Sequence, residues 1–133
     1  MCATLRRAAR ALTQHYEQAL RPLGLKSSQF TILQALSITK EVSQGELGEI
    51  LAMDSTTLTR TLEIMGRRGW ISKQPGKDRR ERRISLAKAG EIQLRRALPR
   101  WDKVQTQLRD RFGNSRWDDL LSSTNNVTSL VMD

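Results

Sequence analysis

Residues 44–62 constrain the fold most, because they hold two short helical stripes with almost no chain between them. The apolar positions of this segment, which repeat at three- and four-residue steps, are Leu47, Ile50, Leu51, Met53, Leu58 and Leu62. Such steps are typical of amphipathic helices, with Met53 expected at the corner between them. Two short helices joined by so tight a turn predict a helix-turn-helix.

The second of these helices exposes a polar face. Asp54 and Ser55 are expected to cap it. The residues expected on the exposed face of its first turns are Ser55, Thr56, Thr57, Thr59 and Arg60. In DNA-binding helix-turn-helix proteins these turns enter the major groove, where hydroxyls and arginine bind phosphates or base edges. We add Ser43 and Gln44, at the start of the first helix, as candidate DNA contacts. The alternative is an ordinary helical hairpin whose Ser and Thr residues are caps.

A basic hairpin is predicted after the helix-turn-helix. Residues 70–74 and 82–86 flank the turn sequence Pro75-Gly76-Lys77-Asp78 and predict two strands. Residues 73–83 hold six basic and two acidic residues, a net charge of +4, and residues 66–83 carry +6 of the total +9. Charge concentrated in this way suits phosphate contact. The candidate contacts in this wing are Lys77, Asp78, Arg79, Arg80 and Arg82, with Asp78 expected to hold the Arg80 guanidinium by a two-point contact.

The remaining chain is predicted to be helical. The expected helices lie at about 4–20, after Ser27, at about 87–112 and in a final amphipathic segment. Ser27 is expected to cap the second of them. The predicted fold is therefore mostly α with a small β-hairpin wing: a single winged helix-turn-helix domain. We expect a DNA-binding lobe at about 27–86. The segments 1–21 and 88–133 are expected to be dimerisation helices, since a palindromic DNA site requires a two-fold protein.

Composition excludes several classes of function. The chain has one cysteine, Cys2, and one histidine, His15, which argues against a disulfide within the chain and against a zinc site. No apolar run approaches the ~20 residues that span a bilayer, and the start lacks the apolar stretch of a signal peptide. No catalytic or cofactor motif is found. We therefore expect a cytoplasmic protein that is not an enzyme, has no cofactor and does not bind membranes.

The combination of motifs resembles the MarR-type regulators over nearly the whole chain. The residues that carry this resemblance are 20–25, 29–30, 44–47, 53–60, 69–71, 78–80, 84–86 and Gly90. One departure is Ala87, where the family usually has a threonine that caps the long helix. The resemblance implies a homodimer that represses genes by occupying a pseudo-palindromic operator in double-stranded DNA. It also implies an effector, a small aromatic compound or an oxidant, that loosens DNA binding.

The resemblance also makes Cys2 a candidate redox sensor. In the peroxide-sensing branch of the family a cysteine begins the first helix, and Tyr16 matches a tyrosine that hydrogen bonds with it. A second tyrosine of that branch falls at Arg6, so Arg6 or Arg7 would have to activate the thiol by charge. The alternative is that Cys2 is an incidental N-terminal residue. For the whole chain, the alternative function is a non-sequence-specific or architectural winged-helix protein that binds nucleic acid.

Overall fold

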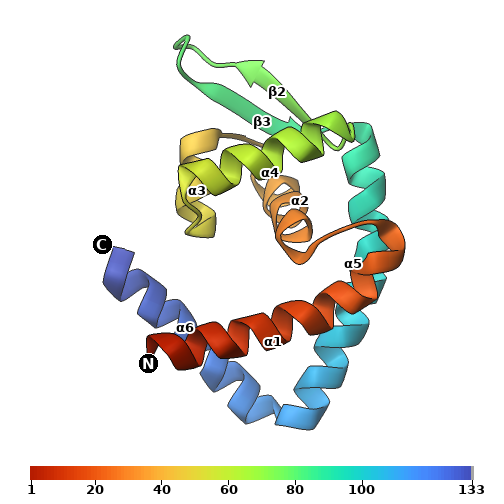
Figure 1. The fold of residues 1–133 in the computed structure, drawn as a ribbon, viewed down its shortest axis with the longest axis vertical. Coiled ribbons are helices and arrows are strands. Elements are labelled where there is room, and N and C mark those ends of the chain that lie inside the picture. Colours follow the sequence, from red (N-terminus) through yellow and green to blue (C-terminus); the bar gives the residue numbers. More distant parts are fainter. Residues whose placement is uncertain (133) are drawn as a thin grey trace.

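Three helices and a small sheet form one lobe, and three longer helices make up the rest of the molecule (Figure 1). The computed structural model describes residues 1–132. In chain order its elements are α1 (Cys2–Leu20), the 3-10 helix η1 (Arg21–Leu23), α2 (Ser27–Thr39), β1 (Glu41–Ser43), α3 (Gln44–Leu51), α4 (Ser55–Arg67), β2 (Ile71–Pro75), β3 (Arg82–Leu86), α5 (Lys88–Phe112) and α6 (Asn114–Met132). This order confirms the predicted winged helix-turn-helix, with α3 and α4 as its two helices. Within 1–132, no helix is long and apolar enough to cross a membrane.

The start of α2 differs from the prediction. Ser27 was expected to cap this helix, but the capping position is Lys26, and Ser27 is the first helical residue. The backbone N–H and the hydroxyl of Ser27 both donate to a carboxylate oxygen of Glu17 at 3.2 Å. The Glu17 carboxylate thus accepts the N–H of the first helical residue of α2, and it ties α2 to α1.

The sheet has three strands where two were predicted, in the order β1-β3-β2. β2 and β3 form the expected antiparallel hairpin, and β1 adds to the free side of β3 with Ser43 opposite Arg83. Three residues are too few to show an alternating pattern, which is why β1 was missed. Its middle residue, Val42, is buried against the core.

The core of the lobe lies between α2, the helix-turn-helix and the sheet. Its fully buried side chains include Phe30, Leu33, Leu36, Leu47, Leu58, Leu62, Met65 and Ile84. Ile50 was counted in the apolar stripe expected to bury the first helix of the motif, and this was wrong, since Ile50 is 56% exposed. α3 has only eight residues, and it presents one edge, with Leu47 and Leu51, to the core. Ile50 lies about 100° around the helix from Leu51 and therefore faces outward.

The turn between α3 and α4 is tight and strained. Ala52 ends α3 in the left-handed conformation, with φ 51° and ψ 41°. This conformation costs a residue with a Cβ atom about 1–2 kcal/mol. The next residue, Met53, donates its N–H back to the Gly48 carbonyl at 2.9 Å, which closes the corner.

The start of α5 lies directly against the strand region of the lobe. Its capping position, Ala87, provides no side-chain hydrogen bond, as the departure from the family pattern implies. The Ala87 N–H instead donates to the Trp70 carbonyl at 3.0 Å. Gly90 packs so closely on this carbonyl that a Cβ atom would lie 2.0 Å from its oxygen. The backbone of α5 is thereby held on the backbone of the wing.

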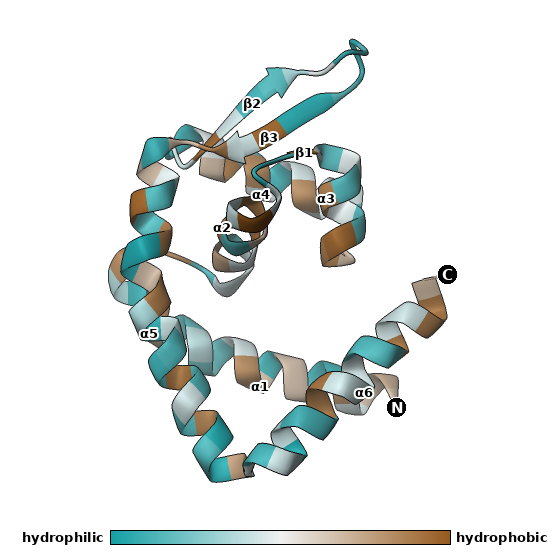
Figure 2. Cartoon of the chain, turned by 180° about the vertical axis from the view of Figure 1, so that it is seen from behind, coloured by the Kyte–Doolittle hydropathy of each residue, from teal (hydrophilic) through white to brown (hydrophobic). Residues whose placement is uncertain are grey.

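The outer helices carry hydrophobic positions along their length (Figure 2), and several of these side chains are exposed. α1 is attached at its C-terminal half, where Tyr16 stacks on Trp101 of α5 with ring centroids 3.9 Å apart. α6 has no buried residue, and Arg109 fixes its corner with α5 through an ion pair of 2.8 Å to Asp118. The large apolar residues exposed on α1 and α6 are Leu5, Leu12, Leu120, Leu121, Val127, Leu130, Val131 and Met132. Such an extent of exposed apolar surface is typical of a protein interface.

Candidate nucleic-acid interface

The predicted recognition helix, α4, presents the expected face to solvent. Leu58 and Leu62 are buried; of the residues between them, Thr59 and Arg60 are exposed and Thr61 is half-buried. The exposed predicted residues are Ser55, Thr56, Thr57, Thr59 and Arg60. A hollow of about 320 Å³ on this face is lined by Ser55, Thr56, Thr59, Arg60 and Glu63. Sequence reasoning did not single out Glu63, although it lies on the same face three residues after Arg60.

Asp54 caps α4 as predicted. One carboxylate oxygen accepts the Thr57 N–H at 2.8 Å, and the other accepts the Thr57 hydroxyl at 2.7 Å. These hydrogen bonds hold the pKa of Asp54 below its ordinary value. The capping contribution is therefore present at neutral pH and is lost as the pH falls through this lowered pKa. Because the Thr57 hydroxyl is committed to the cap, it is less available to DNA than the other hydroxyls.

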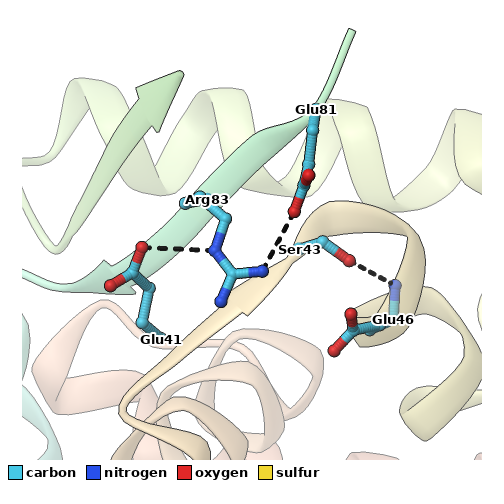
Figure 3. Close-up of polar contacts among 5 residues, drawn as sticks. All are labelled: Glu41, Ser43, Glu46, Glu81 and Arg83. Carbon is cyan, nitrogen blue, oxygen red and sulfur yellow. Dashed lines mark hydrogen bonds and ion pairs between the residues drawn. The ribbon is translucent and has the colours of Figure 1, made fainter. Parts of the chain in front are cut away.

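The start of α3 lies beside the start of α4 and the wing. Ser43 caps α3 by accepting the Glu46 N–H at 3.1 Å (Figure 3), and Gln44 donates to the Thr59 hydroxyl at 2.9 Å. A hollow of about 860 Å³ brings together five of the predicted residues, which are Ser43, Gln44, Ser55, Arg80 and Arg82. Polar groups that lie up to 39 positions apart in sequence thus line one concave surface.

The tip of the wing is exposed, including Lys77, Asp78, Arg79 and Arg80. The expected contact between Asp78 and the Arg80 guanidinium is not formed. Asp78 instead accepts the backbone N–H of Arg80 at 3.2 Å, and its carbonyl accepts the Glu81 N–H at 3.0 Å. An aspartate readily bonds the backbone two residues on, and this contact shapes the turn. The Arg80 guanidinium has no ion-pair partner within the described chain.

Among residues 1–132, Arg83 is the wing arginine that forms ion pairs. Its Nε lies 3.2 Å from Glu41, and its Nη1 lies 3.0 Å from Glu81 (Figure 3). Hydrogen bonds from Arg83 to Glu81 and then to Glu41 raise the pKa of its guanidinium. Glu81 lies only two residues from Arg83, directly before β3, but Glu41 reaches Arg83 only through β1, which was not predicted.

The candidate sensor residues lie far apart within one chain. Cys2 and Tyr16 are fourteen residues apart on the single helix α1, which corresponds to about 21 Å. Cys2 is exposed, and its sulfur accepts a bond from Arg6 at 3.4 Å. Tyr16 is buried and donates its hydroxyl to Gln105, and burial raises the pKa of its phenol. Among residues 1–132, no cluster of three His, Cys, Asp or Glu side chains is arranged to hold a metal ion.

Several known proteins are similar to this chain in sequence or in structure. A family model described as the MarR family matches residues 23–81. The HTH-type transcriptional regulator YwoH of Bacillus subtilis is 31% identical over 87 residues, which span 65% of this chain and 64% of YwoH. The organic hydroperoxide resistance transcriptional regulator of the same organism is 30% identical over 99 residues, 74% of this chain and 67% of that protein.

A solved structure matches over almost the full length. The M. tuberculosis transcriptional regulator MosR, in complex with DNA, is 37% identical and has a TM-score of 0.90. The match covers 98% of this chain and 94% of that one. The similarity therefore includes the outer helices as well as the winged lobe.

Proposed function

The chain belongs to the MarR family, and on this basis we propose that it regulates transcription by binding a pseudo-palindromic operator in double-stranded DNA as a homodimer. Its family and fold are those of DNA-binding transcription regulators and not of enzymes. The MosR structure that it resembles was determined with DNA. A protein with this role would act in the cytoplasm.

The observation that carries this proposal is the exposed hydroxyl and arginine face of α4 beside an exposed basic wing tip. The helix suits base edges in the major groove, and the wing suits phosphates or a narrow minor groove. Residues 27–86 would form the DNA-binding lobe. Residues 1–21 and 88–133 would form the dimer, although Asp133 lies outside the described residues.

Selection of bound sequences from random duplex DNA tests the proposal directly. We expect an enriched sequence with two-fold symmetry and half-sites about 10 bp apart, centre to centre. A protein that binds DNA without sequence preference would enrich nothing. That result would favour the architectural alternative.

Replacing Arg60 with alanine should weaken operator binding by about 1–3 kcal/mol and relax the base preference at one position in each half-site. Arg60 is exposed on α4 and has no ion-pair partner within residues 1–132, so its guanidinium is free to bind a base. Repeating the selection with the variant measures both effects. An unchanged base preference would mean that Arg60 does not read sequence.

Replacing Arg80 with alanine should lower affinity for many sequences alike. The free guanidinium at the wing tip would contact a phosphate, and each such contact releases counterions. The slope of log K against log salt should therefore become shallower by about 1. Binding titrations at several salt concentrations measure this slope, and equal slopes for the two proteins would contradict phosphate contact by Arg80.

We further propose repression that an effector relieves, with an oxidant as the effector class. One relative is named for organic hydroperoxide resistance, and Arg6 lies against the Cys2 sulfur. Tyr16 would meet Cys2 only across a dimer. Mild peroxide should then weaken operator binding of the wild type and leave the Cys2→Ser variant unaffected, and a Cys2→Ser protein that still responds would exclude the sensor. A small aromatic effector would act without Cys2.

A further inference from the structure

Arg83 occupies the root of the wing, between two carboxylates that come from different segments. Glu81 directly precedes β3, and its carboxylate accepts a hydrogen bond from Nη1 of Arg83 at 3.0 Å. In the antiparallel pairing, Ser43 lies opposite Arg83, which places Glu41 at the diagonal position on the same face. Figure 3 shows the guanidinium lying between the two carboxylates.

Glu41 connects this cluster to the helix-turn-helix. It begins β1, and β1 ends at Ser43, the residue that caps α3. No loop separates the strand from the helix, since α3 begins at Gln44. The position of Glu41 is therefore coupled to the start of α3 through the three residues of β1, whose backbone pairs with β3.

Glu81 connects the same cluster to the tip of the wing. The Glu81 carbonyl accepts the Gly76 N–H at 2.9 Å, and its side chain lies over Gly76, where a Cβ atom would be 2.9 Å away. Glu81 therefore crosses the hairpin near its tip and reaches back to Arg83. The Arg83 guanidinium thus bonds both Glu81, near the tip of the wing, and Glu41, in the strand next to β3.

The charge of the cluster is unsuitable for phosphate. One arginine and two glutamates sum to −1, and the Arg83 side chain is only 30% exposed. Arg82, the next residue, is exposed on the opposite face of β3 and has no ion-pair partner within the described chain. Two adjacent arginines of the basic wing are thus placed for different tasks.

We propose that Arg83 is a positioning residue that holds the wing in a fixed orientation relative to α3 and does not bind phosphate. This inference rests on the proposed DNA-binding function. By fixing the wing, Arg83 and its two partners would set the distance between the wing-tip arginines and the exposed face of α4. Both surfaces could then engage one duplex without first being ordered, which saves conformational entropy on binding.

The test compares three variants, Arg83→Gln, Glu41→Gln and the matched control Arg82→Gln, in titrations of a labelled operator duplex obtained by selection. Arg82→Gln should make the salt slope shallower by about 1. Arg83→Gln should weaken binding about fivefold with the slope unchanged, in keeping with two partly exposed ion pairs. Glu41→Gln should weaken binding about twofold, although it removes a negative charge near DNA.

The Glu41 variant separates the two explanations most sharply. If the cluster acted only through charge, neutralising Glu41 would tighten binding, and that result would overturn the proposal. A slope for Arg83→Gln as shallow as that of Arg82→Gln would also overturn it. Amide hydrogen exchange without DNA tests, independently of binding, whether the clamp formed by Arg83, Glu41 and Glu81 stabilises the wing. Exchange in β1 and in residues 76–81 should be faster in Arg83→Gln than in Arg82→Gln. Unchanged exchange would mean that the clamp is absent, whereas faster exchange in a protein that binds no operator would locate the failure in the proposed function.

Discussion

Replacing Gly90 with alanine is expected to lower the free energy of unfolding by about 3 kcal/mol or more. The new Cβ atom would lie 2.0 Å from the Trp70 carbonyl oxygen and 2.9 Å from its carbon, closer than atoms can approach. Both partners are backbone, so no side chain can rotate away, and the start of α5 must shift. Overpacking costs 1–3 kcal/mol where side chains adjust, and here the adjustment breaks the bond between Ala87 and Trp70 as well.

Urea denaturation followed by circular dichroism measures this loss, with Gly66→Ala as the control. Gly66 lies within α4 with nothing within 4 Å of its missing Cβ. Alanine there should stabilise the protein by up to about 1 kcal/mol, because glycine is a poor helix former. Equal stabilities for Gly90→Ala and the wild type would mean that α5 does not rest on the wing backbone.

Introducing two aspartates into the apolar stripe of α6 is expected to separate the dimer and weaken operator binding more than 100-fold. Leu120 and Val127 are 43% and 39% exposed, and they lie seven residues apart on one face of α6. Two desolvated charges without partners cost far more than a dimer interface of ordinary size can offset. A monomer engages one half-site and loses the gain in effective concentration that the second provides.

The double variant Asn125→Asp/Asn126→Asp is the matched control, since it adds the same charge to α6 at exposed polar positions. Sedimentation velocity should show a dimer for the control and a monomer for Leu120→Asp/Val127→Asp. Circular dichroism tests whether the monomer keeps its helices. A folded double variant that remains dimeric would place the interface elsewhere.

Periodic patterns predicted the fold well because they report burial. The stripes of α4 and the alternating wing strands repeat often enough to be read, and both elements lie where they were expected. The failures involve partners distant in sequence. Ser27 bonds Glu17 of another helix, and Arg83 bonds Glu41 across a strand that is too short to show a pattern.

The candidate site was predicted in composition but not in its internal contacts. Exposure of the α4 hydroxyls followed directly from helical geometry. The predicted contact between Asp78 and the Arg80 guanidinium was wrong, because the Asp78 carboxylate accepts the backbone N–H of Arg80 within the turn. Charge counts in a sequence treat all arginines alike, whereas among residues 1–132 the fold pairs Arg83 and gives Arg80 and Arg82 no ion-pair partner.

α5 runs without a break for 25 residues, through Pro99, from the wing to the corner with α6. Along its path a helix of this length measures about 37 Å, close to one turn of B-form DNA. Because this one helix joins the DNA-binding lobe to the proposed dimerisation helices, we expect it to restrict the separation of the two lobes in a dimer. One extra base pair between the half-sites rotates the second half-site by about 35° around the duplex. The second lobe could follow this rotation only if α5 or the dimer interface changed its geometry. The protein would then distinguish operators by the spacing of their half-sites as well as by their base sequence.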